Sequence, residues 1–212
     1  MRGRECGATP LNAEAAYLFR HALLRDAAYQ LQLPGDRCRL HACALEAIEA
    51  VCGGRPPAPD RSFQPHPADA FALELVAHIR AARSANPELV PPSLLPLYLQ
   101  RAAEFAARRF RHEVAQQCWG ELAEQAAGAD QAEFTLRSGK AAFARGRSRE
   151  ALALAGRASE IFRSLADRRG ESRALAVLGT LLAQAGRTSE AEDAYGRALA
   201  IHRERGDREY EG

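Results

Sequence analysis

Apolar positions in the C-terminal half of the chain follow a helical period. Leu175, Leu178 and Leu182 recur at i, i+3 and i+7, which places their side chains on one face of a helix. Tyr195 and Leu199 lie four residues apart on the next predicted helix. β-branched residues are few, so helix propensity is high along most of the chain. The expected fold class is therefore all-α.

Small residues repeat at a spacing of 40 residues and predict stacked helical hairpins. Four pairs recur in register: Gly139 and Gly179, Gly146 and Gly186, Ala151 and Ala191, Ala158 and Ala198. Two antiparallel helices approach closely only where one presents Gly or Ala to the other, so these positions should be buried between nested helices. Gly146 and Gly186 are expected to end the first helices, and Ser148 and Ser189 to begin the second ones.

A degenerate hairpin precedes these two. Its Ala115 lies 36 residues before Ala151. Trp119 is expected to fill the core of this hairpin rather than to stack on a ligand. Tyr195 holds the equivalent place in the last hairpin, and its side chain is also expected to be buried.

In the N-terminal part of the chain, the pattern of apolar residues and Pro-rich stretches predicts shorter helices separated by irregular segments. One helix starts at about residue 21 and carries an apolar stripe that ends at Leu31. A second, over residues 34–51, begins at Pro34 and places Leu40 and Leu45 on a shared face. A third amphipathic helix, over residues 67–85, lies between two Pro-rich stretches that read as linkers or irregular loops.

These patterns divide the chain into three parts. Residues 1–52 form a small helical unit, and residues 53–93 form a linker with one amphipathic helix. Residues 94–212 form the helical repeats. The repeats are expected at 94–128, 129–168 and 169–206, with the start of another at 207–212.

Composition excludes several classes of partner. The 29 basic and 27 acidic residues give a net charge of +2, which favours neither nucleic acid nor an anionic membrane as a partner. Five cysteines without a paired CxxC spacing are typical of reduced thiols, and so of a cytoplasmic location. No apolar run approaches the roughly 18 residues that a membrane helix needs.

The sequence offers little chemistry for catalysis or metal binding. Cys38, His41 and Cys52 could share one side of a helix, but the paired spacing of a structural zinc site is absent and buried packing is the ordinary role of such cysteines. There is no GxSxG elbow and no phosphate-binding GxxxxGK[ST] loop. Acidic pairs such as Glu121 and Glu124 are expected on solvated helix faces. We therefore expect no catalytic residue, no metal and no cofactor.

The C-terminal pattern resembles the tetratricopeptide repeat. Leu178-Gly179, Gly186, Ala191, Tyr195 and Ala198 match the spaced positions of one such motif. Two positions depart from it: Ser138 replaces a large residue before Gly139, and Arg203 stands where the family has its closing proline. The resemblance implies antiparallel hairpins stacked as a right-handed solenoid, whose first helices line a concave groove for a protein or peptide partner.

Register along the first helices predicts the residues that face this groove, although a merely solvated polar face would show the same pattern. They are Gln100, Glu104, Glu133, Arg137, Lys140, Phe143, Arg173, Thr180 and Gln184. The peptide-carboxylate clamp of the family uses asparagine where this chain has Lys140 and Thr180. The combination of Arg137, Lys140 and Phe143 instead favours a moderately acidic peptide or protein surface.

The N-terminal segment resembles a different family. The order Phe19-Arg20-His21, Leu23-Leu24-Arg25-Asp26 and Ala28-Tyr29 is similar to the winged-helix-like segment that follows the nucleotide-binding module in STAND-type signalling ATPases, including large bacterial regulators and cyclases. This resemblance implies a nucleotide-sensing latch of Arg20, His21 and Arg25 that works beside an upstream nucleotide-binding domain. The alternative for His21 is a structural role at a helix start.

Two functions remain open at this point. The first is a non-catalytic interaction or sensor module that forms the C-terminal arm of a STAND-type ATPase or of a transcriptional or cyclase regulator. The alternative is a free-standing tetratricopeptide adaptor that binds a peptide in its groove.

Overall fold

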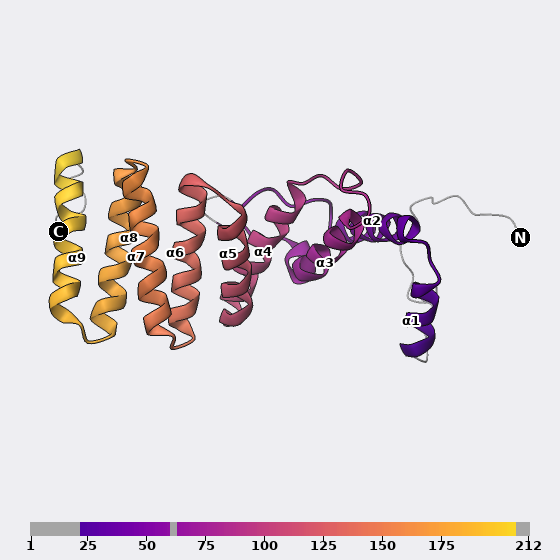
Figure 1. Cartoon of the computed structure of the whole chain (residues 1–212), viewed down its shortest axis with the longest axis horizontal. Helices are drawn as coiled ribbons and strands as arrows, with labels where there is room; N and C mark the ends of the chain where they lie inside the picture. The colour runs from indigo at the N-terminus through magenta and orange to yellow at the C-terminus, as the bar shows by residue number, and fades with distance from the viewer. Residues whose placement is uncertain (1–21, 60–62, 207–212) are drawn as a thin grey trace, which may run out of the picture.

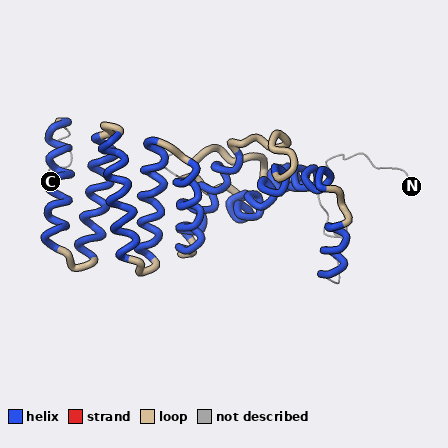
Figure 2. Tube along the Cα trace, in the orientation of Figure 1, coloured by secondary structure: helices blue, strands red, loops and turns tan. Residues whose placement is uncertain are grey.

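The computed structural model describes residues 22–59 and 63–206, except for the side chains of residues 22–25 and 205. Within this part of the chain the regular elements are all helical (Figures 1 and 2). In order they are α1 (Ala22–Gln30), α2 (Pro34–Val51), the short 3-10 helix η2 (Pro67–Phe71), α3 (Ala72–Arg83), α4 (Leu94–Arg108), α5 (His112–Gln125), α6 (Gly128–Ala144), α7 (Ser148–Ser164), α8 (Arg168–Gln184) and α9 (Thr188–Arg205).

Consecutive helices pack against one another as hairpins. Helices α4 to α9 stand side by side as the pairs α4/α5, α6/α7 and α8/α9, and α2 and α3 continue the stack at its N-terminal end (Figure 1). The prediction of an all-α stack of hairpins is confirmed. Helix α1 lies at the far N-terminal edge of the arrangement (Figure 1).

Small residues lie where the helices nest, as predicted. Gly139 and Gly179 are buried, and Ala151 and Ala191 are only 0% and 2% exposed. A Cβ atom on Gly139 would lie 3.2 Å from the carbonyl oxygen of Ala151, so the two backbones touch with no room between them. A Cβ atom on Gly179 would lie 2.8 Å from the ring of Tyr195.

The hairpin turns also follow the prediction. Gly146 and Gly186 both have φ of +76°, the left-handed conformation that ends a helix. Helix α7 begins at Ser148, and α9 begins at Thr188, one residue before the predicted Ser189.

Three sequence expectations are wrong in detail. Tyr195 is 37% exposed rather than buried, because no described helix packs beyond α9 to cover its outer side. Leu40 is 56% exposed while Leu45 is buried, so they do not share the inner face of α2. The helix predicted from residue 67 starts as the 3-10 turn η2, where His66 and Asp69 form a reciprocal capping box.

The first Pro-rich stretch is an irregular loop fixed to α4. Buried Arg101 donates from Nη1 to the carbonyl of Pro57 at 3.0 Å and from Nη2 to the carbonyl of Gln64 at 2.8 Å. One hydrophobic cluster also runs without interruption from Leu45 of α2 to Ala141 of α6. The core therefore crosses the predicted boundaries at residues 52 and 93, and the division into three units stays a prediction.

Candidate partner-binding site

A hollow of about 430 Å³ opens between the first two hairpins. Helix α4 supplies Glu104, Ala107 and Arg108, and α5 supplies His112 and Trp119. Helix α6 supplies Glu133, Arg137, Lys140, Ala141 and Ala144, and the Pro-rich loop supplies Phe63. Four residues predicted to face the groove, namely Glu104, Glu133, Arg137 and Lys140, therefore line the same hollow.

Arg137 is a fixed part of the wall. Its Nε donates to Oε1 of Glu133 at 2.8 Å, one turn earlier on α6, and its Nη1 pairs with Glu104 across the gap to α4. The guanidinium carbon also lies 4.9 Å from the centre of the Trp119 ring. The guanidinium of Arg137 thus contacts two carboxylates and one aromatic face, and these contacts hold the side chain in one orientation.

Glu133 connects the hollow to the next hairpin. Its second carboxylate oxygen accepts a hydrogen bond from Nη2 of Arg173 on α8 at 2.8 Å. Burial alone would raise the pKa of Glu133, but the hydrogen bond from Arg137 and the positive charges of Arg173, Arg137 and Lys140 outweigh it, so the pKa lies below its ordinary value. Glu133 is therefore ionised at neutral pH.

Lys140 has a different environment from Arg137. Its side chain is exposed at the hollow, and no carboxylate of the described chain lies within 4 Å of its ammonium group. Desolvation lowers the pKa of Lys140, while the charge of Glu133 opposes this shift. Among the cations that line the inner wall on α6, Lys140 is the one whose charge has no direct partner in the described residues.

Trp119 fills the core, as predicted, and also touches the hollow. It is 4% exposed and stacks on Phe134, with 5.8 Å between the ring centres. The guanidinium of Arg137 lies over the same ring. The ring therefore supports the polar wall rather than standing free to stack on a ligand.

Sequence reasoning missed the outer rim of the hollow. Phe63 packs between two arginines, with the guanidinium carbons of Arg101 and Arg108 at 5.0 and 4.7 Å from its ring centre. Because Phe63 comes from the loop before the repeats, no register along the helices could place it here. Its one sequence signal is that it is an aromatic residue within a Pro-rich stretch.

The remaining predicted groove residues lie outside this hollow. Phe143 is half-buried and packs against the core of the second hairpin. Thr180 donates to the carbonyl of Ala176 and accepts a hydrogen bond from the Tyr195 hydroxyl at 3.1 Å. Gln100 on α4 is half-buried and Gln184 at the end of α8 is exposed, and neither lines the hollow. Their part in binding stays a prediction.

The predicted nucleotide latch falls largely outside the described residues. Arg20 and His21 precede them, and Arg25 lies on α1 with a side chain that is not described. The latch therefore stays a prediction.

The cysteines and histidines of α2 have separate neighbours. The Cys38 thiol lies 3.4 Å from the carbonyl oxygen of Ala81, whereas Nδ1 of His41 lies 2.8 Å from Nδ1 of His78. Cys52 is buried. Across residues 22–59 and 63–206, no three His, Cys, Asp or Glu side chains converge in a metal-binding group.

The comparisons with known proteins agree with the C-terminal geometry. The family model of the tetratricopeptide repeat matches residues 130–204, which span α6 to α9. No curated protein matches the chain. In the described part of the chain, no helix has both the length and the apolar character needed to cross a bilayer. Residues 130–204 are therefore similar to the tetratricopeptide repeat, a fold that is typically non-catalytic and that generally binds other proteins.

Proposed function

We propose that this chain is a non-catalytic protein-interaction module that binds an acidic segment of a protein partner in the hollow between α4, α5 and α6. The observation that carries the proposal is the contrast between two cations on one face of α6. The charge of Arg137 is balanced by Glu104 and Glu133, whereas Lys140 has no carboxylate within 4 Å in the described chain.

The other walls suit a short peptide segment. Phe63, Ala141 and Ala144 give apolar contact beside Lys140, and Arg108 supplies a second cation at the rim. A partner carboxylate at Lys140 would form a charge-assisted hydrogen bond in a partly desolvated place. The fixed Arg137 network keeps the wall in shape before the partner arrives, which lowers the entropic cost of binding.

A charge reversal tests this site directly. The probe is a fluorescein-labelled library of eight-residue peptides that combine Glu or Asp with Leu or Phe, and binding is measured by fluorescence anisotropy at low salt. Lys140→Glu should weaken binding at least about tenfold, the loss expected for a charged pair at an interface. Arg149→Glu, the same charge change at an exposed position on α7, is the matched control and should bind like the unchanged chain.

The result that would overturn the site is equal binding by the chain with Lys140→Glu. Circular dichroism of each variant shows whether the helices are intact, so that a loss of folding is not mistaken for a loss of contact. Arg137 is less suitable for this purpose, because its replacement would also leave Glu104 and Glu133 without their partner.

We also propose a wider context, in which this module forms the C-terminal arm of a STAND-type signalling ATPase or of a related transcriptional or cyclase regulator. The support is the residue order from Phe19 to Tyr29, together with the helical repeats expected from residue 94 onward. A free-standing adaptor is equally compatible with the repeats. The natural reading frame separates the two: a GxxxxGK[ST] loop encoded within a few hundred residues upstream supports the ATPase arm, and a stop codon directly upstream contradicts it.

A further inference from the structure

The three hairpin turns of the stack share one backbone geometry. Phe110, Gly146 and Gly186 occupy the same position in the turns α4–α5, α6–α7 and α8–α9, with φ of +59°, +76° and +76°. The following residue in each turn is an arginine whose N–H reaches back to the preceding helix, at 2.8 Å for Arg111, 3.0 Å for Arg147 and 2.9 Å for Arg187. All three turns lie along the lower edge of the stack in Figures 1 and 2.

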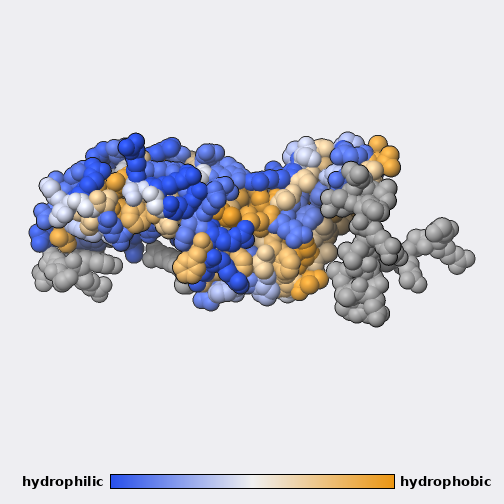
Figure 3. All heavy atoms as spheres, turned by 90° about the horizontal axis from the view of Figure 1, so that it is seen from below, coloured by the Kyte–Doolittle hydropathy of each residue, from blue (hydrophilic) through white to orange (hydrophobic). Residues whose placement is uncertain are grey.

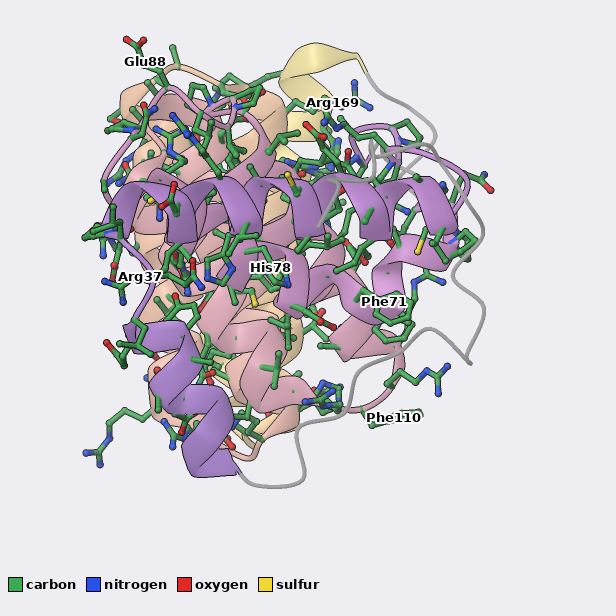
Figure 4. All side chains as sticks on the ribbon, turned by 90° about the vertical axis from the view of Figure 1, so that its right-hand side faces the viewer. Arg37, Phe71, His78, Glu88, Phe110 and Arg169 are labelled. Atoms are coloured by element: carbon green, nitrogen blue, oxygen red, sulfur yellow. The ribbon has the colours of Figure 1, made fainter. Side chains whose placement is uncertain are left out.

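Phe110 is the exception among these turns. The left-handed conformation is unfavourable for a bulky side chain, and the two sister turns avoid the strain with glycine. Packing does not compensate for it, since Phe110 is 83% exposed, and in the described part of the chain its ring is paired with the His112 ring alone, edge-on at 6.0 Å between ring centres. Figure 4 shows the Phe110 ring projecting from the edge of the helical stack. A strained, exposed aromatic residue indicates a role outside the fold.

The α4–α5 turn also differs from the α6–α7 and α8–α9 turns in the ion pairing of its arginines. On the sister turns, Arg145 pairs with Glu113, Arg147 with Glu150, and Arg187 with Glu190. On the α4–α5 turn, Arg108, Arg109 and Arg111 are exposed, and none has a carboxylate of the described chain within 4 Å. The guanidiniums of Arg108 and Arg109 instead lie over the rings of Phe63 and Phe105.

We propose that residues 109–111, here called the aromatic turn, form a second docking surface that receives an acidic amphipathic helix of a protein partner. The Phe110 ring packs on the apolar stripe of that helix, and Arg109 and Arg111 pair with carboxylates that flank the stripe. Aromatic and arginine side chains together are the residues that most often dominate the energy of protein interfaces.

The neighbouring surface favours a protein over a polyanion. Nucleic acid and anionic membranes need a continuous basic track, but the arginines of the two sister turns are already neutralised and the net charge of the chain is only +2. In Figure 3, which looks at the molecule from this edge, hydrophilic surface dominates toward α6–α9 and hydrophobic patches interrupt it toward α2–α5. The basic cluster on the α4–α5 turn is therefore short, and it lies beside apolar surface. This combination matches a helix that carries acidic residues around one apolar stripe.

The experiment uses the full chain and a defined probe. The probe is a labelled 18-residue peptide with Leu at i, i+3 and i+7 and Glu at the remaining positions, and binding is followed by anisotropy. Phe110→Gly should weaken binding at least tenfold and leave the melting temperature unchanged or higher, because glycine relieves the strained turn. Arg111→Glu should weaken binding by a similar factor.

Two controls fix the interpretation. Arg187→Glu makes the same change at the equivalent place in the α8–α9 turn and should alter binding less than twofold. Arg149→Glu, at an exposed position on α7 away from this turn, should also alter binding less than twofold. The proposal is overturned if Phe110→Gly binds as tightly as the unchanged chain, if it melts at a lower temperature, or if single-stranded RNA or phosphatidylserine vesicles bind while the peptide does not.

Discussion

Nε of Arg101 on α4 lies 2.5 Å from Oδ1 of Asp69 in η2, and the two side chains are only 1% and 2% exposed. The same guanidinium donates to the carbonyls of Pro57 and Gln64, so each of its three nitrogen atoms has an acceptor. This buried pair fastens the Pro-rich loop, and with it Phe63, against the first hairpin.

Replacing Arg101 should destabilise the chain strongly. Arg101→Met leaves the Asp69 carboxylate buried without its partner, a change that costs about 3–5 kcal/mol in comparable buried pairs. The free energy of unfolding, from urea denaturation followed by circular dichroism, measures the loss. The double variant Arg101→Met/Asp69→Asn removes both charges, keeps a side-chain acceptor for the N–H of His66, and should recover part of the stability. A single variant as stable as the unchanged chain would show that the pair does not hold the loop.

Glu49 should make stability depend on pH in the acid range. Its carboxylate accepts hydrogen bonds from the Tyr98 hydroxyl at 2.6 Å and from Arg55 at 2.9 and 3.0 Å. Burial would raise the pKa of Glu49, but the hydrogen bonds from Arg55 and Tyr98 and the charge of Arg55 bring it below the reference value of 4.5. Because the folded pKa is the lower one, this contribution is complete well above pH 4.5 and is lost as the pH falls through the folded value.

The variant Glu49→Gln tests that assignment. At pH 7 it should lower the free energy of unfolding by about 1–3 kcal/mol, since a charged acceptor is replaced in a buried cluster. The gap between the two proteins should narrow as the pH falls below 4.5. A gap that stays constant from pH 7 to pH 3 would contradict the assignment.

Ser138 marks a place where the stack can be improved. It is buried at the position where the last hairpin has Leu178, and it borders a hollow of about 120 Å³ with Thr135 and Leu154. Ser138→Leu should fill this space and raise stability by about 0.5–2 kcal/mol, as cavity-filling changes commonly do. Ser138→Ala, which adds no volume, should not. A lower melting temperature for Ser138→Leu would mean that the space cannot accept the side chain.

The sequence predicted the helices and their nesting well because both depend on local periodicity. Leu175 and Ala151 each belong to a pattern of apolar or small residues with a fixed spacing. That spacing alone predicts which face of the helix is buried, and both residues are buried. Tyr195 shows the limit of this reasoning. Its register matches a core position, but its exposure depends on which described helix packs beside α9, and periodicity carries no such information.

The candidate site was predictable only along single helices. The pair Glu133 and Arg137 follows from the i, i+4 spacing on α6. The contact of Arg137 with Glu104 and the arrival of Phe63 from a loop both depend on tertiary packing, so neither could be found by register. The contrast between Arg137 and Lys140, which carries the proposed function, appears only once these contacts are known.

The central claim is that small residues at matched positions allow the helices to nest, and one pair of glycine substitutions tests it most directly. Gly139 faces the backbone of α7 at 3.2 Å, whereas Gly196 on α9 has no atom within 4 Å of an added Cβ. Leucine is a better helix former than glycine by about 0.5–1 kcal/mol, so Gly196→Leu should stabilise the chain slightly. Gly139→Leu should instead lower the free energy of unfolding by about 1–3 kcal/mol or more through overpacking. Equal or greater stability for Gly139→Leu, measured by urea denaturation beside Gly196→Leu, would contradict the account.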